Sequence, residues 1–254
     1  MNTSNFFPTK INAQFMQIGL NVVGVASGQS WQKFLPGCQS VIVWGSGGTL
    51  LWEEFLKDLK QFPQRFSQNS HPLDNYVLRA LTRIDPNPPA SRRWIRCAAD
   101  ETEFLDFRTL GYQAGLGWES KLGLLLNSDY GPWLGLRLAC FTMDSIEPTG
   151  PLRDIEPCAG CRAPCVEACP AGAVSKNSRW DVALCASFHQ KSTLCDQTCL
   201  AREACPEGQP HQYSNLQRHY HYNRESGRAA LAEFLNISPE KPGKNLPWNE
   251  WVRG

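Results

Sequence analysis

CAGCRAPCVEACP, from Cys158 to Pro170, decides the fold of the second part of this chain. Its four cysteines are spaced C-x2-C-x3-C-x3-C, and a proline follows the last of them. Four more cysteines come soon afterwards, so that one 48-residue stretch holds Cys158, Cys161, Cys165, Cys169, Cys185, Cys195, Cys199 and Cys205. In a reducing compartment, thiols gathered at this density are typical of metal ligation and not of disulfides.

The spacing is close to the bacterial two-cluster ferredoxin run C-x2-C-x2-C-x3-C-P, with one more residue between Cys161 and Cys165. In that run three thiolates bind one [4Fe-4S] cluster and the fourth binds the other cluster. The second set of cysteines ends in the same Cys-Pro step at Cys205. A crossed arrangement therefore predicts one cluster on Cys158, Cys161, Cys165 and Cys205, and another on Cys169, Cys185, Cys195 and Cys199.

Two alternatives remain for these eight cysteines. A pair of four-thiolate zinc sites is the main one, because zinc also takes tetrahedral sulfur ligands, and a disulfide scaffold is the less favoured one. The long gaps after Cys161 and Cys199 leave open whether one cluster is [3Fe-4S]. The remaining cysteines are expected to be small buried hydrophobes: Cys38, Cys97 and Cys140.

The chain of 254 residues changes in composition near residue 150, where a proline-rich linker, SIEPTGPLRDIEP (145–157), begins. We therefore expect a domain over 1–150, a cluster module over 151–236 and a C-terminal tail over 237–254. In the first domain, Val-rich segments predict strands at 19–26, 40–46, 94–98 and 132–142. Amphipathic segments predict helices at 49–62, from 72 to about 84, and at 101–113. This alternation indicates an α/β or α+β sandwich.

Charge and hydropathy exclude several classes of protein. Lys and Arg number 25 against 24 Asp and Glu, and neither half has the one-sided basic excess of a strong nucleic-acid binder. No apolar run approaches the roughly 20 residues that cross a bilayer. The first residues, MNTSNFFPTK, lack the pattern of a secretory signal, so we expect a cytoplasmic protein without a membrane span.

GLGWESKLGLLLNSDYGPWLGLRL (115–138), followed by CAGC, CVEACPAGAV and WDVALCASF, resembles epoxyqueuosine reductase and, more distantly, the reductive dehalogenases. LPGCQSVIVWGSGGTLLWEEFLKDL (35–59) is similar to cobalamin-processing proteins of the cblC type. The resemblance implies an α+β fold: a modified nitroreductase-like sandwich followed by a ferredoxin-like module with two [4Fe-4S] clusters. It also implies a cobalamin cofactor held between the two parts.

By this resemblance, the residues that line the corrin are Gly115, Leu116, Gly117, Trp118, Lys121, Asn127, Tyr130 and Gly131. Glycines let the backbone approach a flat macrocycle closely, and Trp118 and Trp133 offer stacking faces. Lys121 could meet a propionamide or a phosphate. The alternative interpretation is a tight turn with two core aromatic residues. Flavin is the alternative cofactor, for which Arg92, Arg93 and Arg96 form a thin phosphate-binding cluster.

The proton donor of epoxyqueuosine reductase, an acid followed by a proline two or three residues later, has no exact counterpart here. Asp100 is the candidate catalytic acid and Glu101 the reserve, although an acidic helix N-terminus explains both carboxylates equally well. The aromatic and basic stretch 211–224 could bind a phosphate, but a polar cap over the second cluster is the preferred interpretation.

The expected function is that of an iron–sulfur oxidoreductase, a cobalamin-dependent reductase that passes single electrons to a bound corrinoid. The reaction would process the corrinoid itself or reduce a small organic substrate, with an external donor of the flavodoxin or ferredoxin type. An epoxyqueuosine-type tRNA reductase is the less favoured alternative, because the chain lacks the longer C-terminal region and the basic surface of that enzyme. A non-enzymatic electron carrier without corrinoid is the other.

Overall fold

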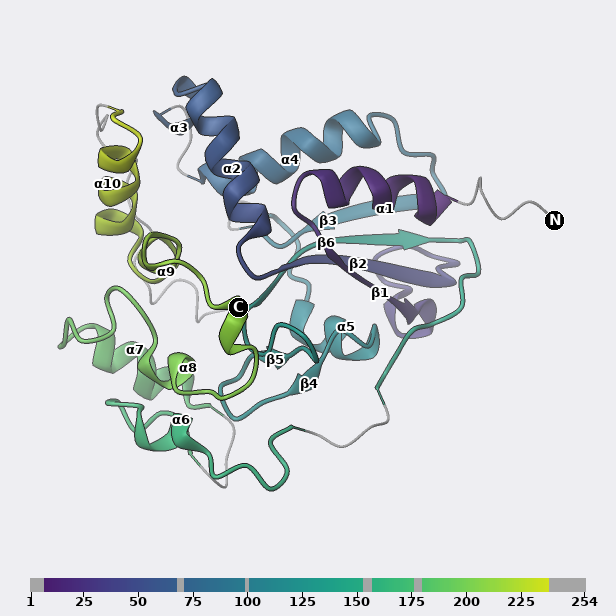
Figure 1. Cartoon of the computed structure of the whole chain (residues 1–254). Coiled ribbons are helices and arrows are strands. Elements are labelled where there is room, and N and C mark those ends of the chain that lie inside the picture. Colours follow the sequence, from purple (N-terminus) through teal and green to yellow (C-terminus); the bar gives the residue numbers. More distant parts are fainter. Residues whose placement is uncertain (1–6, 68–70, 99–100, 153–156, 176–179, 238–254) are drawn as a thin grey trace. The chain divides into compact units, whose positions relative to one another are not determined.

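The structure, a computed structural model, describes residues 7–67, 71–98, 101–152, 157–175 and 180–237. The chain forms two compact units, each built from several segments of the sequence. Unit 1 comprises 1–58, 71–117 and 134–154, and unit 2 comprises 59–70, 118–133 and 155–254. Figure 1 shows the elements of both units along the chain. The expected tail falls outside the described residues from 238 onwards.

Unit 1 is built on a four-stranded antiparallel sheet with the order β1-β2-β6-β3. Its strands are β1 (Val22–Ser27), β2 (Ser40–Gly47), β6 (Leu134–Thr142) and β3 (Arg92–Arg96). Every residue of the central strand β2 is buried, which explains why its sequence is apolar throughout and does not alternate. The strands predicted near 19–26, 40–46, 94–98 and 132–142 are therefore confirmed, and the antiparallel order makes this an α+β fold.

Helices cover one face of the sheet. α1 (Phe7–Gln17) places Phe15 against Trp44 of β2, with ring centroids 5.1 Å apart, and against Trp94 of β3. α4 (Pro72–Ile84) lies beside α1 and buries the stripe that the sequence predicted. α2 (Leu50–Gln61) agrees with the predicted helix at 49–62.

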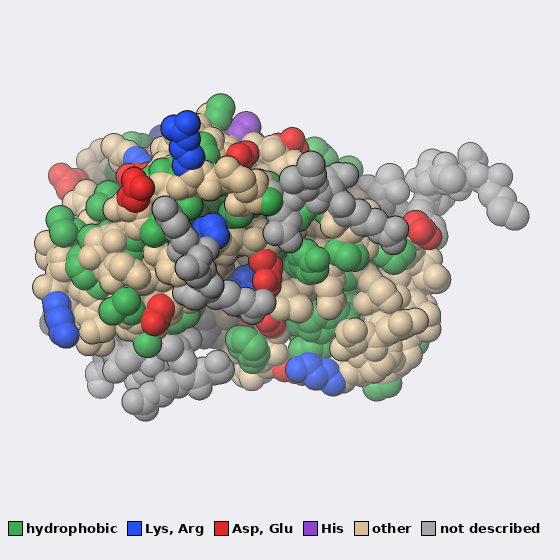
Figure 2. Space-filling model, turned by 90° about the horizontal axis from the view of Figure 1, so that it is seen from below, with side chains coloured by type: hydrophobic (Ala, Val, Ile, Leu, Met, Phe, Trp, Pro, Cys, Tyr) green, Lys and Arg blue, Asp and Glu red, His purple; other side chains and the backbone are tan. Residues whose placement is uncertain are grey.

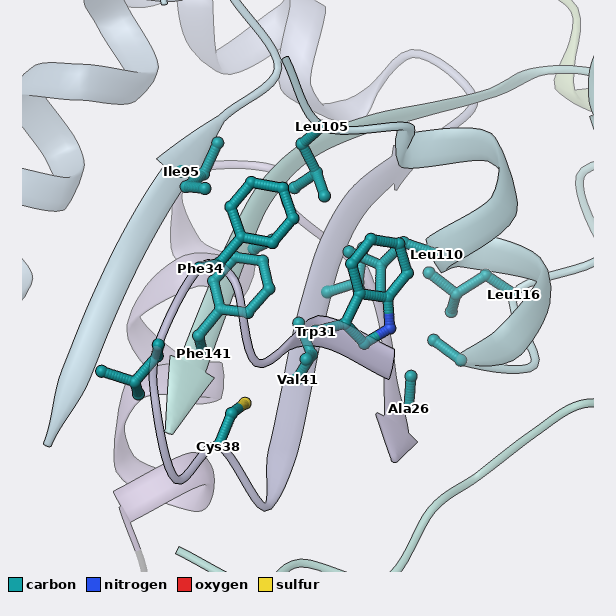
Figure 3. Packing of buried hydrophobic residues seen from close by; sticks show 14 residues of the cluster. Ala26, Trp31, Phe34, Cys38, Val41, Ile95, Leu105, Leu110, Leu116 and Phe141 are labelled. Carbon is teal, nitrogen blue, oxygen red and sulfur yellow. The ribbon is translucent and has the colours of Figure 1, made fainter. Parts of the chain in front are cut away.

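The other face of the sheet carries the main hydrophobic core (Figure 3). Trp31, at the end of the 3-10 turn η2 (Gly28–Trp31), points toward Leu110 of α5 (Phe107–Gln113). Phe34 stacks on Phe141 of β6 with their centroids 4.9 Å apart. Ile95 and Val41 project from the sheet into the same cluster, so the strands carry apolar side chains on both faces.

The helix predicted over 101–113 is shorter than expected. It begins at Phe107 because the Asp106 carboxylate accepts hydrogen bonds from the backbone amides of Arg108, at 3.1 Å, and Thr109, at 3.0 Å. An N-cap of this kind satisfies backbone N–H donors that have no partner inside the helix, and it fixes the residue at which the helix begins. The acidic residues before Asp106 therefore precede the helix and do not form its first turn.

Unit 2 is assembled from short elements: α3 (Gln64–Ser67), β4 (Trp118–Glu119), β5 (Leu125–Leu126), α6 (Pro164–Glu167), α7 (Val182–His189), α8 (Leu200–Glu203), η3 (Gln209–His211), α9 (Asn215–Tyr222) and α10 (Arg224–Phe234). α6 contacts α8, and α9 contacts α10. A small core joins Leu122 and Leu126 of the β4–β5 hairpin to Cys165 and Cys205. No helix among the described residues is both long and apolar enough to cross a membrane.

Candidate metal centres

Four cysteines of the cysteine-rich stretch line one cavity in unit 2. The cavity has about 360 Å³ of open space, and Ser120, Lys121 and Leu122 of the β4–β5 hairpin form part of its wall. We call this group of thiols site A: Cys158, Cys161, Cys165 and Cys205. The structure thus brings Cys205 to the three cysteines that open the motif, although 40 residues separate Cys205 from Cys165 in the sequence.

The other four cysteines form a second group, which we call site B: Cys169, Cys185, Cys195 and Cys199. Besides burial, the neighbouring thiols Cys199 and Cys169 raise the pKa of Cys185. The same two neighbours, together with Cys185, act on the pKa of Cys195. The thiol neighbours that shift the pKa values of Cys165, Cys185, Cys195, Cys199 and Cys205 all lie within the same group of four as the thiol they act on.

Burial raises the pKa of most of these thiols, and it raises that of Cys205 to about 11. Neighbouring thiols raise these pKa values further, because several thiolates repel one another. Such sites favour the neutral thiol until a metal supplies positive charge. The donor set therefore fits groups that bind thiolates and carry cationic iron.

Ala163 accommodates the additional residue between Cys161 and Cys165. Its backbone is left-handed, with φ at 59°, and its amide donates a hydrogen bond of 3.4 Å to the Cys161 sulfur. A left-handed residue turns the chain sharply, so α6 begins directly after it and carries Cys165 back to the cavity. The longer gap is therefore compatible with four ligands at site A.

The short helix α8 connects the two sites. Cys199 of site B is its N-cap residue, and the backbone amides of the first turn, at Arg202 and Ala201, work against the burial that raises the pKa of the Cys199 thiol. Cys205 of site A lies two residues beyond the end of α8. The residues between Cys199 and Cys205 thus form one turn of helix and a short connection after it.

Iron–sulfur clusters and zinc ions need different arrangements of four thiols. A zinc ion holds four sulfurs at about 2.3 Å from one centre, whereas a cubane binds each thiolate to a separate iron. In the described part of the chain, no three His, Cys, Asp or Glu side chains gather closely enough to hold a single ion.

Two of the three remaining cysteines are buried as expected, Cys38 and Cys140. Cys97 is exposed, so its prediction as a small buried hydrophobe was wrong. It follows directly after the edge strand β3, where the chain leaves the sheet.

The positions expected to line a corrin fall in both units. In unit 1, Gly115 has φ at +71° in the turn after α5, and a Cβ there would lie 2.7 Å from the carbonyl oxygen of Thr149. The Leu116 side chain packs in the main core, and Gly117 ends this segment. The glycine at 115 is thus required by a close approach of two backbone segments within unit 1.

The unit 2 positions form the hairpin and the turn that follows it. Lys121 lines the cavity of site A. The Asn127 side chain accepts hydrogen bonds from the amides of Asp129 and Tyr130, which fixes the turn. A Cβ on Gly131 would lie 2.4 Å from the carbonyl oxygen of Glu207, so this turn rests on the backbone just after Cys205.

Two tryptophans of unit 2 fit a further polar ligand. The indole N–H groups of Trp118 and Trp133 are buried and have no hydrogen-bond acceptor among the residues that the structure describes. Buried donors are normally satisfied, so each has room for an acceptor from outside the described part of the chain. The carbonyl oxygens of a corrinoid's amide side chains are acceptors of this kind.

Of the two candidate acids, the structure describes only Glu101. Asp100 lies outside the described residues. Glu101 turns back onto β3, where its carboxylate accepts a hydrogen bond of 3.3 Å from the Arg96 amide and lies 3.7 Å from the Arg96 side-chain Nε. Glu101 therefore closes a local turn.

The arginines considered for a flavin phosphate are paired with carboxylates. Arg92 contacts Asp85 at 3.1 Å, Arg93 contacts Glu103, and Arg96 contacts Glu101. Their charges are largely neutralised within unit 1, which weakens the flavin alternative.

The aromatic and basic stretch 211–224 makes its described contacts with its own residues and with other residues of unit 2. Arg218 contacts Glu203 and Asn215, and the His219 ring contacts the Ser226 hydroxyl. The Tyr213 ring packs against Trp133 with centroids 5.3 Å apart. These contacts favour the polar-cap interpretation of this stretch.

Sequence reasoning missed two side chains beside site B. The Trp180 indole N–H donates a hydrogen bond to the Cys185 sulfur, and Arg202 lies buried next to Cys199. Trp180 was part of a quoted motif, but its direction could not be known. A single arginine within a cysteine-rich stretch carries no pattern that would identify it.

No family model matches the chain. In sequence it is similar to epoxyqueuosine reductases, for example that of Synechococcus sp. (strain RCC307), at 27% identity over 198 residues, which cover 74% of this chain and 60% of that protein. A Listeria monocytogenes epoxyqueuosine reductase is 29% identical over 146 residues, or 50% of this chain and 35% of that one. The chain thus spans at most about three fifths of these relatives.

The fold matches the same group. Epoxyqueuosine reductase from Streptococcus thermophilus aligns with a TM-score of 0.52 at 15% identity, covering 80% of this chain and 66% of that one. The B12-trafficking protein CblC of C. elegans aligns with a TM-score of 0.56 at 12% identity, covering 91% and 97%. A reductive dehalogenase aligns with a TM-score of 0.54 at 14% identity, covering 89% and 35%. The predicted resemblance and the α+β fold are therefore confirmed.

Proposed function

We propose that this protein is an iron–sulfur oxidoreductase of the epoxyqueuosine reductase type, acting on a modified nucleoside in tRNA. The observation that carries the proposal is the division of the eight cysteines into sites A and B, each with four thiols, in a chain whose curated relatives are epoxyqueuosine reductases. The relatives favour this reaction over the small-molecule or corrinoid-processing reaction that the sequence alone favoured.

Each part of the proposal has residues to support it. The thiols of sites A and B would hold two [4Fe-4S] clusters, and the Trp118 and Trp133 N–H groups would meet the amide groups of a corrinoid. When bound, these groups supply single electrons and a strongly reducing cobalt centre. Removal of an epoxide oxygen as water consumes two electrons and two protons, so an external donor of the flavodoxin or ferredoxin type is also required. Asp100 stays the proposed proton donor, with Glu101 in reserve.

A tRNA substrate was the less favoured alternative on sequence grounds, and the comparisons change that weighting. One solved epoxyqueuosine reductase of the same fold is in complex with an epoxyqueuosine-modified tRNA stem loop. Among the described residues on the face drawn in Figure 2, Lys and Arg side chains lie among Asp and Glu with no broad basic field. Few phosphate contacts would give a shallow salt dependence of binding, and specificity would then come mainly from the modified base.

Corrinoid processing is the second candidate. It is favoured by the alignment with CblC, which extends over 97% of that protein. In this case the substrate would be the corrinoid itself, and its upper ligand would be removed.

One experiment tests both candidates. The full chain is reconstituted anaerobically with iron, sulfide and hydroxocobalamin, purified by gel filtration, and incubated with dithionite and either an epoxyqueuosine-containing stem loop or cyanocobalamin. We expect cobalt and about eight irons to co-elute with the protein, and the stem loop to lose one oxygen atom by mass spectrometry. An unmodified stem loop and a C161A/C185A variant are the controls.

Two outcomes would overturn the first candidate. A protein that binds both groups but leaves the stem loop unchanged, and instead removes cyanide from cyanocobalamin, is a corrinoid-processing protein. A protein that binds iron without cobalt is an electron carrier.

A further inference from the structure

Arg202 is a buried cation in α8, in the segment that joins the two sites. Arg202 is only 8% exposed, and Cys199 of site B is the N-cap residue of the same helix. Among the described residues, no carboxylate lies within ion-pair distance of its guanidinium. A buried charge without an ionic partner is costly and calls for an explanation.

Neutral groups hold the guanidinium in place. It donates two hydrogen bonds to the Pro132 carbonyl oxygen, at 2.6 and 3.2 Å, and a longer one of 3.4 Å to the Tyr222 hydroxyl. The Trp133 and Tyr213 rings lie 4.5 and 4.7 Å from its central carbon. These contacts fix its position but leave its positive charge uncompensated, and arginine stays protonated at all accessible pH values.

The charge lies beside a thiol of site B. The positive charge of Arg202 works against the burial that raises the pKa of Cys199. Cys205 of site A has no such neighbour among the groups that shift its pKa, and instead lies near the carboxylate of Glu207. The two sites, similar in their thiols, thus differ in their charged neighbours: a buried arginine lies beside a ligand of site B, whereas site A has Glu207 and Lys121 in the wall of its cavity.

Trp180 adds to the same asymmetry. Its indole N–H donates to the Cys185 sulfur of site B. The described donors to the sulfurs of site A are backbone amides, such as that of Ala163. Hydrogen bonds to the sulfurs and net charge nearby are two of the factors that set the potential of an iron–sulfur cluster.

We propose that Arg202, assisted by Trp180, makes the cluster at site B the more easily reduced of the pair, so that site B holds the first electron. The inference rests on the proposed function, because it needs both clusters. Each cluster accepts one electron from the reductant and no bond forms or breaks. An added electron is stabilised by the fixed cation beside Cys199, which lies in surroundings of low dielectric constant.

The test is a redox titration of the reconstituted full chain with dithionite and mediators, followed by EPR. The wild type should show two one-electron waves. In R202M, whose side chain is of comparable length but neutral, we expect the ratio of reduced to oxidised site B to fall about tenfold at a fixed potential. For a one-electron couple this is a shift of about 59 mV to more negative values. The second wave should stay in place.

R162M is the matched control, because it removes the same charge from an exposed arginine between two ligands of site A. We expect its ratios to stay within about twofold of the wild type, since water screens an exposed charge. W180F keeps an aromatic ring at this position but loses the indole N–H, and should shift the wave of site B in the same direction as R202M.

R202K keeps the charge. If R202M fails to bind the cluster at site B, the titration of R202K tests the proposal instead. A loaded R202K with both waves near their wild-type positions supports the proposal. Loss of the site B cluster in R202K, or an R202M titration that superimposes on the wild type, would overturn it. A wild type without two clusters would instead contradict the proposed function.

Discussion

Ala163 shows how a single residue adapts a cluster motif. The gap between Cys161 and Cys165 is one residue longer than in the ferredoxin run, and the extra residue is taken up by a left-handed alanine. That conformation costs an L-residue roughly 1–2 kcal/mol. Here it directs an amide to the Cys161 sulfur, which repays part of the cost once the sulfur carries negative charge.

Substitutions at Ala163 should separate backbone conformation from side-chain volume. We expect A163G to retain the wild-type iron content, because glycine adopts a positive φ freely, although it loses a buried methyl group. A163V should lose iron from site A, since a β-branched residue is strongly disfavoured there. Iron and sulfide per chain after anaerobic reconstitution measure the effect. Equal iron content in A163V and wild type would show that the conformation at this position does not matter.

At the scale of elements, buried segments could be predicted and their ends could not. The Val-rich strands and the amphipathic α2 and α4 have periodicities that follow directly from burial. The predicted start of α5 was too early, because the stretch 101–106 is rich in acidic residues, which are typical of a first helical turn. Their true role depends on which carboxylate reaches a backbone amide, and that is settled by packing.

Asp106 should therefore support α5 in a pH-dependent way. Burial alone would raise the pKa of Asp106, but hydrogen bonds from Thr109 and Arg108 and the charge of Arg108 lower it overall. A carboxyl with a lowered pKa in the folded state adds stability above its unfolded pKa of about 3.9, and this stability is lost as the pH falls through the folded value.

D106A should reduce the free energy of unfolding by about 1 kcal/mol at pH 7, and D106N by less because its amide oxygen still caps the helix. The difference between wild type and D106N should shrink as the pH falls from about 5 to about 3. Urea titrations at each pH measure these differences. A difference that grows toward low pH would mean that the carboxyl, and not the carboxylate, is the stabilising form.

At the scale of the whole chain, the local motif predicted the type of chemistry well. It did not predict how other side chains are arranged around the cysteines. The Cys-rich spacing predicted the ligands and the motif predicted their crossed pairing, but the surroundings of each site depend on residues from distant segments. Pro132 and Trp133 come from the turn before β6, and Tyr213 and Tyr222 from the last part of unit 2. Such contacts between segments leave no periodic signal in one sequence.

The central claim is that Cys205 shares a cluster with Cys158 and not with its nearer neighbour Cys199. Iron and sulfide analysis of reconstituted single and double alanine variants tests it most directly. We expect C158A, C205A and the C158A/C205A double variant each to keep about four irons per chain, because all three lose only site A. C199A/C205A should keep almost none, since it loses a ligand from each site. Four irons in C199A/C205A together with none in C158A/C205A would contradict the crossed arrangement.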